Sequence, residues 1–385
     1  MTWDVLIIVG GPAGAIAAAD LARCGYRVGV LERKRFPRGK LCGEFLAPRG
    51  VARLQQHGLL TPLLRAGARR IRNAVFISLG GHSHCLPLSR FSESVEFGLG
   101  ISRATLDHLL LDHARACGAD VLERVCVTDA IASSGRIVGV RARLSPSGTR
   151  VTFFAAVVID ASGRARVLGS PTPRARSEGD ARLFAFQAHV SGIAGVGEAV
   201  QLYFYPSGYG GLVRIEGDLV NLCGLTTWAT LRRAGGDPKQ LLALTMGQNP
   251  RAQEILRNAR LETPLAGCGP LRFGLRALPR EYLAVGDAAA SLDPFLGHGI
   301  TLALESGLLA AALTDAAFRA GDPTTLAPRY ARAFRRCFAR IWRAAGWLRP
   351  IASHHAVGDR VLALLPERAL AHRLLRALLF GGRTG

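Results

Sequence analysis

Lysine is almost absent from this sequence: among 385 residues only Lys34, Lys40 and Lys239 occur. Lysine and arginine together still outnumber aspartate and glutamate by 49 to 28, so arginine carries nearly all of the net charge of +21. Such a charge suits nucleic acid, an anionic membrane or acidic ligands as partners. Because the arginines are spread through every segment and no run of five like charges occurs, we interpret the charge mainly as a compositional bias and expect no nucleic-acid partner.

Regular cysteine spacing is also absent. The eight cysteines form no CxxC pair, which argues against a disulfide framework and a structural zinc site, and suits the reducing cytoplasm. His82, His84 and Cys85 form a short cluster. No second half lies at metal-ligand spacing, so we expect a surface loop or strand here and no metal.

Long apolar runs are missing as well. No stretch of about 18 uninterrupted apolar residues occurs, so we expect no membrane-spanning helix. The apolar N-terminal segment is cut by a glycine turn and has no positively charged start, which argues against a secretory signal. A hydrophobic content of 49% with 20% charged residues predicts a globular protein, and the length allows two intertwined domains.

The first 32 residues predict a strand–helix–strand unit. An apolar strand over 4–9 is followed by the turn Gly10–Gly14, an alanine-rich helix and a second strand that ends at Glu32. In the dinucleotide fingerprint GxGxxG, Gly11 and Gly14 fill the second and third positions, but Val9 stands where the first glycine is expected. A β-branched residue fits an unusual backbone conformation poorly. The alternative is a Rossmann-like unit without a nucleotide.

Two later strands also end in small polar turns. The strand before Asp160 runs into Ala-Ser-Gly163, and the strand before Asp287 leads to the segment Asp293–Gly299 and then a helix. An acid at such a strand end can bind a polyol chain, and backbone N–H groups at a helix start can stabilise negative charge on a ring.

The remaining pattern completes the layout. We expect strands over 73–98, 121–160 and 181–228 with a turn at 206–211, and helices over 103–117 and 299–320. The chain therefore starts in a nucleotide-binding unit, leaves it and returns near residue 285. The predicted fold class is α/β, with these domains: a Rossmann-type cofactor domain of residues 1–72, 99–172 and 270–325; a β-sheet substrate domain of 73–98 and 173–269; and a C-terminal helical segment of 326–385.

Together these motifs resemble the flavoprotein family of p-hydroxybenzoate hydroxylase and geranylgeranyl reductase, from residue 4 to about 320. The shared order is the glycine turn, Glu-Arg, ISRATLDHLL, VVIDASGR and GDAAASLDPFLGHGI. The stretch Phe36–Glu44 (FPRGKLCGE) is most similar to the geranylgeranyl reductase branch. The resemblance implies an FAD-dependent oxidoreductase.

The resemblance also implies site residues. The glycine turn, with Pro12 and Ala13 between its glycines, would hold the FAD pyrophosphate, and Glu32, followed by Arg33, would bind the adenosine ribose. The other cofactor contacts would be Arg103 at a phosphate or ribose, Val127 through its backbone at the adenine, Asp160 and Gly163 of an Asp-Gly motif, Asp287 at the ribityl phosphate, and Pro294, Gly297, His298 and Gly299 along the isoalloxazine ring. The His298 side chain receives no role of its own.

The catalytic residues stay open. Cys42 would lie near the flavin by the resemblance, or is only a small residue in a cofactor loop. Tyr209 would orient a substrate or donate a proton, or only covers the sheet. The reductase branch has Pro-x-x-Tyr-x-Trp where this chain has Gly211 in place of Trp, which implies a roomier substrate cavity.

The C-terminal segment is basic: from 331 to 385 it has eleven arginines against Asp359 and Glu367. It is either a peripheral membrane contact that admits a lipid substrate, or a helical cap with solvated arginines.

Three functions follow as hypotheses. The first is reduction of double bonds in a small apolar prenyl- or polyene-type substrate. The second is an FAD monooxygenase that hydroxylates an aromatic or polyketide-derived ring. The third is a homologue with weakened or lost FAD binding. The first two need NAD(P)H or another electron donor, and no second GxGxxG marks a separate domain for it. We expect a cytoplasmic protein, with the membrane contact as an option.

Overall fold

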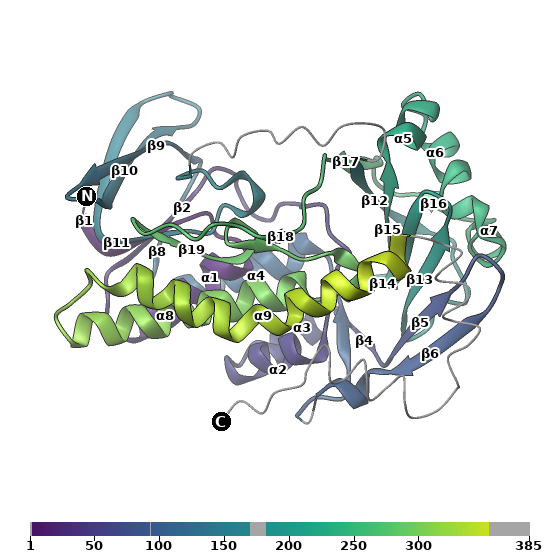
Figure 1. Cartoon of the computed structure of the whole chain (residues 1–385), viewed down its shortest axis with the longest axis horizontal. Coiled ribbons are helices and arrows are strands. Elements are labelled where there is room, and N and C mark those ends of the chain that lie inside the picture. The colour runs from purple at the N-terminus through teal and green to yellow at the C-terminus, as the bar shows by residue number, and fades with distance from the viewer. Residues whose placement is uncertain (1, 93, 170–181, 354–385) are drawn as a thin grey trace.

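The structure, a computed structural model, describes residues 2–92, 94–169 and 182–353, and it has two large β-sheets with helices packed against the first (Figure 1). In the first sheet the central strands are parallel: β1 pairs with β2 and β11, β2 with β8, and β11 with β19. The order is β8 (Asp120–Glu123), β2 (Val28–Glu32), β1 (Thr2–Ile8), β11 (Arg150–Asp160), β10 (Arg136–Leu144) and β9 (Val125–Ser133), with β19 (Leu283–Ala284) also on β11.

Helices α1 (Pro12–Arg23), α4 (Arg103–Ala116) and α8 (Gly299–Arg319) pack together beside this sheet. Strand β1 is buried over Val5–Ile8, as expected for a central parallel strand covered on both faces. The alanine-rich sequence of α1 allows a close approach to α8, where a Cβ on Gly307 would lie 2.3 Å from the carbonyl oxygen of Ala13. These elements confirm the predicted α/β Rossmann-type fold and the helices expected over 103–117 and 299–320.

The second large sheet is mostly antiparallel and comes from two separate stretches of the chain. Its order is β16 (Arg260–Leu261), β12 (Leu183–Ser191), β15 (Val220–Thr227), β14 (Gly208–Arg214), β13 (Ala199–Tyr205), β5 (Asn73–Ile77) and β6 (Ser83–Pro87), with β17 (Ala266–Cys268) on β12. The turn expected over 206–211 is shorter in the structure. The chain reverses at Pro206 and Ser207, so Tyr209 and Gly211 lie inside β14.

Most of the remaining elements belong to neither of the two large sheets. The strand expected before Asp287 is only two residues long, and His84 and Cys85 lie on β6 as a surface strand. The bounds are β3 (Phe45–Leu46), β4 (Arg69–Ile71), β7 (Gly98–Gly100), β18 (Gly274–Leu275), β20 (Ala290–Ser291), α2 (Pro48–Gln56), α3 (Leu60–Arg65), α5 (Trp228–Arg233), α6 (Pro238–Leu244), α7 (Pro250–Leu256) and α9 (Leu326–Ser353), with short 3-10 turns η1 (Leu88–Phe91), η2 (Gly163–Ala165), η3 (Met246–Gln248), η4 (Gly286–Ala288) and η5 (Pro294–Leu296).

The two sheets fall in the predicted cofactor and substrate segments, whose boundaries remain predictions. Of the described residues, only α8 is long and apolar enough to cross a membrane by length and composition. Ten of its residues are buried, and it packs against α1, α2 and α9 as a core helix does. Residues 354–385, most of the predicted C-terminal segment, lie outside the described residues.

Candidate functional site

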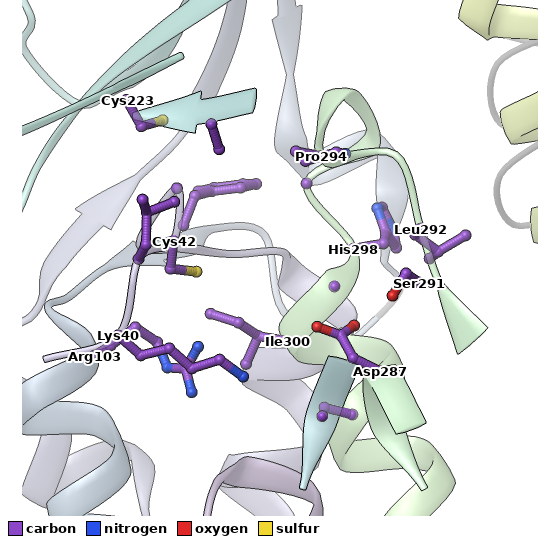
Figure 2. A pocket seen from close by; sticks show the side chains of 18 of the residues that line it. Lys40, Cys42, Arg103, Cys223, Asp287, Ser291, Leu292, Pro294, His298 and Ile300 are labelled. Carbon is purple, nitrogen blue, oxygen red and sulfur yellow. The ribbon is translucent and has the colours of Figure 1, made fainter. Parts of the chain in front are cut away.

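A cavity of about 480 Å³ lies between the carboxyl edge of the parallel strands and the second sheet. In parallel sheets the strand ends meet at one edge, so the three motifs converge here although they are far apart in sequence. Figure 2 shows Lys40, Cys42 and Arg103 on one side of the cavity and Asp287, Ser291 and His298 on the other. The predicted site residues that line the cavity are Gly11, Pro12, Ala13, Glu32, Arg33, Cys42, Arg103, Gly163, Tyr209, Asp287, Pro294, Gly297, His298 and Gly299.

Three predicted residues do not line the cavity. Gly14 lies beneath the turn, where a Cβ would meet the carbonyl oxygen of Val9 at 2.2 Å. Asp160 is fully buried and accepts backbone N–H groups from Ser162 (2.9 Å) and Leu168 (3.2 Å). Val127 lies on β9, away from the lining. Gly14 and Asp160 therefore shape the backbone around the cavity, and the predicted contact of Val127 with a cofactor has no support from its position.

Val9 shows why its position is normally glycine. Its backbone φ is +79°, in the left-handed region that non-glycine residues rarely occupy. The conformation is held because the Val9 N–H donates to the Leu31 carbonyl at 2.8 Å and its own carbonyl packs on Gly14. Gly11 then begins α1, and a Cβ there would meet only the Arg38 side chain, at 3.7 Å. The free N–H groups at the start of α1 therefore face the cavity, which suits a pyrophosphate.

Glu32 ends β2 as an almost fully buried carboxylate. It accepts the backbone N–H groups of Gly10 (3.1 Å) and Lys34 (2.9 Å) and lies 3.9 Å from the guanidinium of Arg38. Arg33 is exposed at the rim. The backbone bonds fix the Glu32 carboxylate at the strand end, where it lines the cavity and can accept hydroxyl groups.

Arg103 is buried at the start of α4 and forms a two-pronged ion pair with Asp107, at 2.7 and 2.6 Å. Arg38 contacts the same carboxylate at 3.1 Å. Burial alone would lower the pKa of Arg103, but the Asp107 carboxylate outweighs it and raises that pKa above its ordinary value. Arg103 is therefore a fixed cation on the cavity wall.

Sequence reasoning missed Lys40, which Figure 2 shows beside Arg103. Its Nζ reaches across to Gly163, where a Cβ would lie 3.4 Å away. Lys40 is exposed to solvent, yet the protein atoms around it partly desolvate its ammonium and lower its pKa, and the Arg103 cation lowers that pKa further while Asp287 opposes the shift. The only available signal was its place in the FPRGKLCGE stretch.

The loop of residues 39–44, here called the Cys42 loop, is fastened to the second sheet by buried polar groups. The Cys42 N–H donates to the Gln187 side chain at 2.9 Å, the Gln187 amide donates to Asn221 at 2.7 Å, and the Asn221 amide donates back to the Cys42 carbonyl at 3.2 Å. This closed ring holds Cys42 by its backbone and leaves its thiol at the cavity wall.

Glu44 completes the attachment of that loop. Its φ of +52° is unusual for a residue with a side chain, and the side chain is buried. One carboxylate oxygen accepts the backbone N–H of Arg103 at 2.8 Å. The other lies 2.7 Å from Nε2 of His189 on β12. The hydrogen bond to Glu44 raises the pKa of His189, although partial burial opposes it. Glu44 therefore joins the Cys42 loop, α4 and the second sheet.

Beyond the Cys42 loop the cavity becomes apolar. Its floor is the second sheet together with η1, and the apolar side chains there are Ala74, Phe76, Leu86, Leu88, Phe91, Val200, Leu202, Leu212 and Val213. Gly211 lies opposite Cys223 in this floor, and a Cβ on it would have its nearest neighbours at 3.5 and 3.7 Å. A single added carbon at Gly211 would therefore fit in ordinary van der Waals contact, and glycine itself adds no side chain to the floor.

Tyr209 connects this floor to η5. Its hydroxyl donates to Asp293 at 2.6 Å, and its ring meets Phe295 edge-on at 5.5 Å. Burial, with the Asp293 carboxylate beside it, raises the pKa of Tyr209 well above its ordinary value. Tyr209 is therefore a neutral anchor between the two walls of the cavity.

Comparison with known proteins identifies the family. The family described as FAD dependent oxidoreductase matches residues 4–171. A menaquinone reductase of Mycobacterium tuberculosis is 30% identical over 343 residues, 86% of this chain and 81% of that protein. A digeranylgeranylglycerophospholipid reductase of Methanospirillum hungatei is 28% identical, covering 84% and 79%. The solved structure of the myxobacterial chondrochloren halogenase CndH has the same fold, with a TM-score of 0.77, 23% identity and coverage of 91% and 82%.

The resemblance read from the motifs is thus confirmed. The glycine turn, the carboxylate at the end of β2, the cations of α4 and the Cys42 loop, and the strand end at Asp287 surround one cavity, and they fit an FAD molecule in its charge and its polar groups. This chain belongs to the family of FAD-dependent oxidoreductases, among the flavoproteins that include the geranylgeranyl reductases.

Proposed function

We propose that this enzyme reduces carbon–carbon double bonds of an elongated apolar substrate of the prenyl or polyene class. The observation that carries the proposal is the apolar half of the cavity, which continues from the cofactor side along β13, β14, β5 and β6 to η1. A pocket lined this way favours a long hydrocarbon over a small polar metabolite. The reductase relatives are consistent with it.

Bound FAD, once reduced, would supply a hydride to one alkene carbon, and the other carbon would take a proton. This chain's residues would do the rest. The start of α1 would hold the pyrophosphate, Glu32 the ribose hydroxyls, and Asp287 the ribityl chain. Arg103 and Lys40 would supply positive charge along the cofactor, and NAD(P)H or another donor would reduce it.

The substrate half would exclude water and align the alkene. The Tyr209 hydroxyl has its hydrogen directed at Asp293, so we propose that Tyr209 orients the wall and that the proton comes from elsewhere. Cys42 remains the candidate donor because its thiol lines the cavity between the cofactor side and the apolar floor.

The test is a single-turnover reaction without oxygen. The purified protein is loaded with FAD, reduced chemically and mixed with a long-chain isoprenoid or with a small phenol. Reoxidation of the flavin by the isoprenoid, with a product that gains two hydrogen atoms, supports the proposal. No reaction until oxygen is admitted, followed by an oxygenated phenol, would replace it with the second candidate.

That second candidate is hydroxylation of an aromatic or polyketide-derived ring by an FAD monooxygenase. One observation favours it: a relative named tryptophan 2-halogenase, of Chondromyces crocatus, is 26% identical over 92% of this chain. Because glycine at position 211 adds no side chain to the floor, the cavity would admit a ring as well as a chain. The oxygen requirement in the experiment above separates the two.

A further inference from the structure

Helix α9 carries two opposed faces. One is anchored in the core by Tyr330, Phe334 and Phe338, and the Tyr330 hydroxyl donates to the Ala284 carbonyl at 3.0 Å. The other face is cationic and is here called the arginine face. Its members are Arg329, Arg332, Arg335, Arg336, Arg340 and Arg343.

The arginines fall on one side of the helix. At 3.6 residues per turn they spread over an arc of about 140°, opposite the aromatic anchors. All of them except the half-buried Arg329 are exposed, and Figure 1 shows α9 (yellow) running along the outside of α8. The full 28 residues of α9 make a rod about 42 Å long.

This face differs from the basic surfaces of three other helices, α4, α7 and α8. In α4, α7 and α8 an arginine pairs with an acid on the same helix: the half-buried Arg115 with Asp112, and the exposed Arg251 and Arg319 with Glu254 and Asp315. Residues 326–353 contain no aspartate or glutamate at all. Like charges three and four residues apart repel, so the helix itself leaves this repulsion uncompensated. An external anion would remove it.

We propose that the arginine face of α9 docks on a lipid bilayer with anionic headgroups. A band of guanidinium groups along one side of a helix can contact many phosphates of a flat anionic surface at once. All the aromatic side chains described in α9 (Tyr330, Phe334, Phe338 and Trp342) pack against the core, so none is offered for stacking on bases, as single-stranded nucleic acid would use.

Docking through α9 would place the cavity close to the bilayer, and the role of this placement in substrate access rests on the proposed function. The helix lies against η5 and β14, the elements that carry Phe295 and Tyr209 into the cavity wall. An elongated apolar substrate would reside in the bilayer. Docking would bring the cavity next to the bilayer in which its substrate is dissolved.

The experiment is vesicle cosedimentation of the full chain at low and high salt, with neutral phosphatidylcholine or with phosphatidylcholine containing phosphatidylglycerol. The α9 variant replaces four exposed arginines: R332Q, R335Q, R336Q and R343Q. The matched control removes the same charge from the α5–β16 side: R233Q, R251Q, R257Q and R260Q. Flavin content and melting temperature check that both variants fold.

We expect binding to anionic vesicles only, weakened by salt. Each arginine near an anionic surface adds about fivefold in affinity, so the α9 variant should bind at least about a hundredfold more weakly, with the control close to wild type. Lysine at the same four positions should retain binding, which keeps the test valid if the glutamine variant unfolds.

Equal loss in the two glutamine variants would mean that only net charge matters and would overturn the proposal. So would binding of the wild type to an RNA or duplex DNA oligonucleotide, but not to vesicles, with the same dependence on α9. The outcome is independent of the reaction: an enzyme that fails to reduce an isoprenoid but docks through α9 contradicts the proposed function alone.

Discussion

Replacing Val9 with glycine should tighten FAD binding. Val9 has a φ of +79° at the start of the glycine turn, where a residue with a Cβ costs about 1–2 kcal/mol relative to glycine. The free protein can lower this cost by letting the turn relax, whereas bound FAD needs the N–H groups of α1 in place. Part of the strain energy therefore makes FAD binding less favourable. Removing it should lower the dissociation constant of FAD about fivefold, which is about 1 kcal/mol of binding free energy.

The overall stability should change less than the affinity. Glycine also loosens the unfolded chain, which costs about 0.5–1 kcal/mol and offsets about half of the relieved strain. The melting temperature of the FAD-free protein should therefore stay near that of wild type. A dissociation constant measured by flavin fluorescence, beside the melting curve, separates the two effects.

Val9→Ala is the matched control, because alanine keeps the Cβ and its backbone cost but removes the two γ-methyl groups of the valine that lines the cavity. If the reasoning from strain is right, the alanine variant binds FAD about as wild type does. Equal tightening in both variants would show that side-chain bulk is responsible, and an unchanged constant for Val9→Gly would show that the turn has adapted to valine.

Three further predictions concern the cavity. Asp287→Ala should weaken FAD binding at least about tenfold, since a hydrogen bond to a charged group is lost, while circular dichroism stays unchanged; wild-type flavin content would remove Asp287 from the site. Glu44 raises the pKa of His189, so their pairing stabilises the fold fully below about pH 6.5 and is lost as pH rises through the raised pKa. The free energy of unfolding, measured with denaturant, should fall for wild type relative to His189→Gln as the pH rises from about 6.5 through the raised pKa. Parallel plots of this free energy against pH for the two proteins would refute the pairing. Gly211→Phe should raise KM for a long isoprenoid at least about tenfold with flavin content unchanged, because the first added carbon fits and the ring then fills the floor; an unchanged KM would place the substrate elsewhere.

The cofactor half of the site was readable from the sequence because its signals are local. Each motif is a buried strand followed by a small-residue turn, and parallel strands bring their ends to one edge without further information. Even the cost of Val9 followed from residue type alone, and the structure gives it a positive φ. The pattern could not distinguish residues that line the cavity from residues that hold the surrounding backbone. Asp160 belongs to its motif, but it accepts backbone N–H groups and does not line the cavity.

The substrate half was less readable. The helices α5, α6 and α7 were missed because each has only six or seven residues, too few for a helical period to stand out. Their capping signals were present: Asp237 and Asn249 each precede a proline at the first helical position. Gly211 was assigned to a turn because glycine and proline cluster near it, whereas its place in β14 is set by pairing with β13 and β15.

The attachment of the Cys42 loop explains why the two halves act as one site. Gln187 lies 145 residues from Cys42, and His189 the same distance from Glu44, so no local pattern announces either contact. Yet Glu44 binds the first N–H of α4 with one oxygen and the second sheet with the other. Because burial makes an unpaired carboxylate costly, Glu44 holds both partners together. Glu44 therefore fixes the start of α4, and with it the backbone of Arg103, relative to β12 of the second sheet.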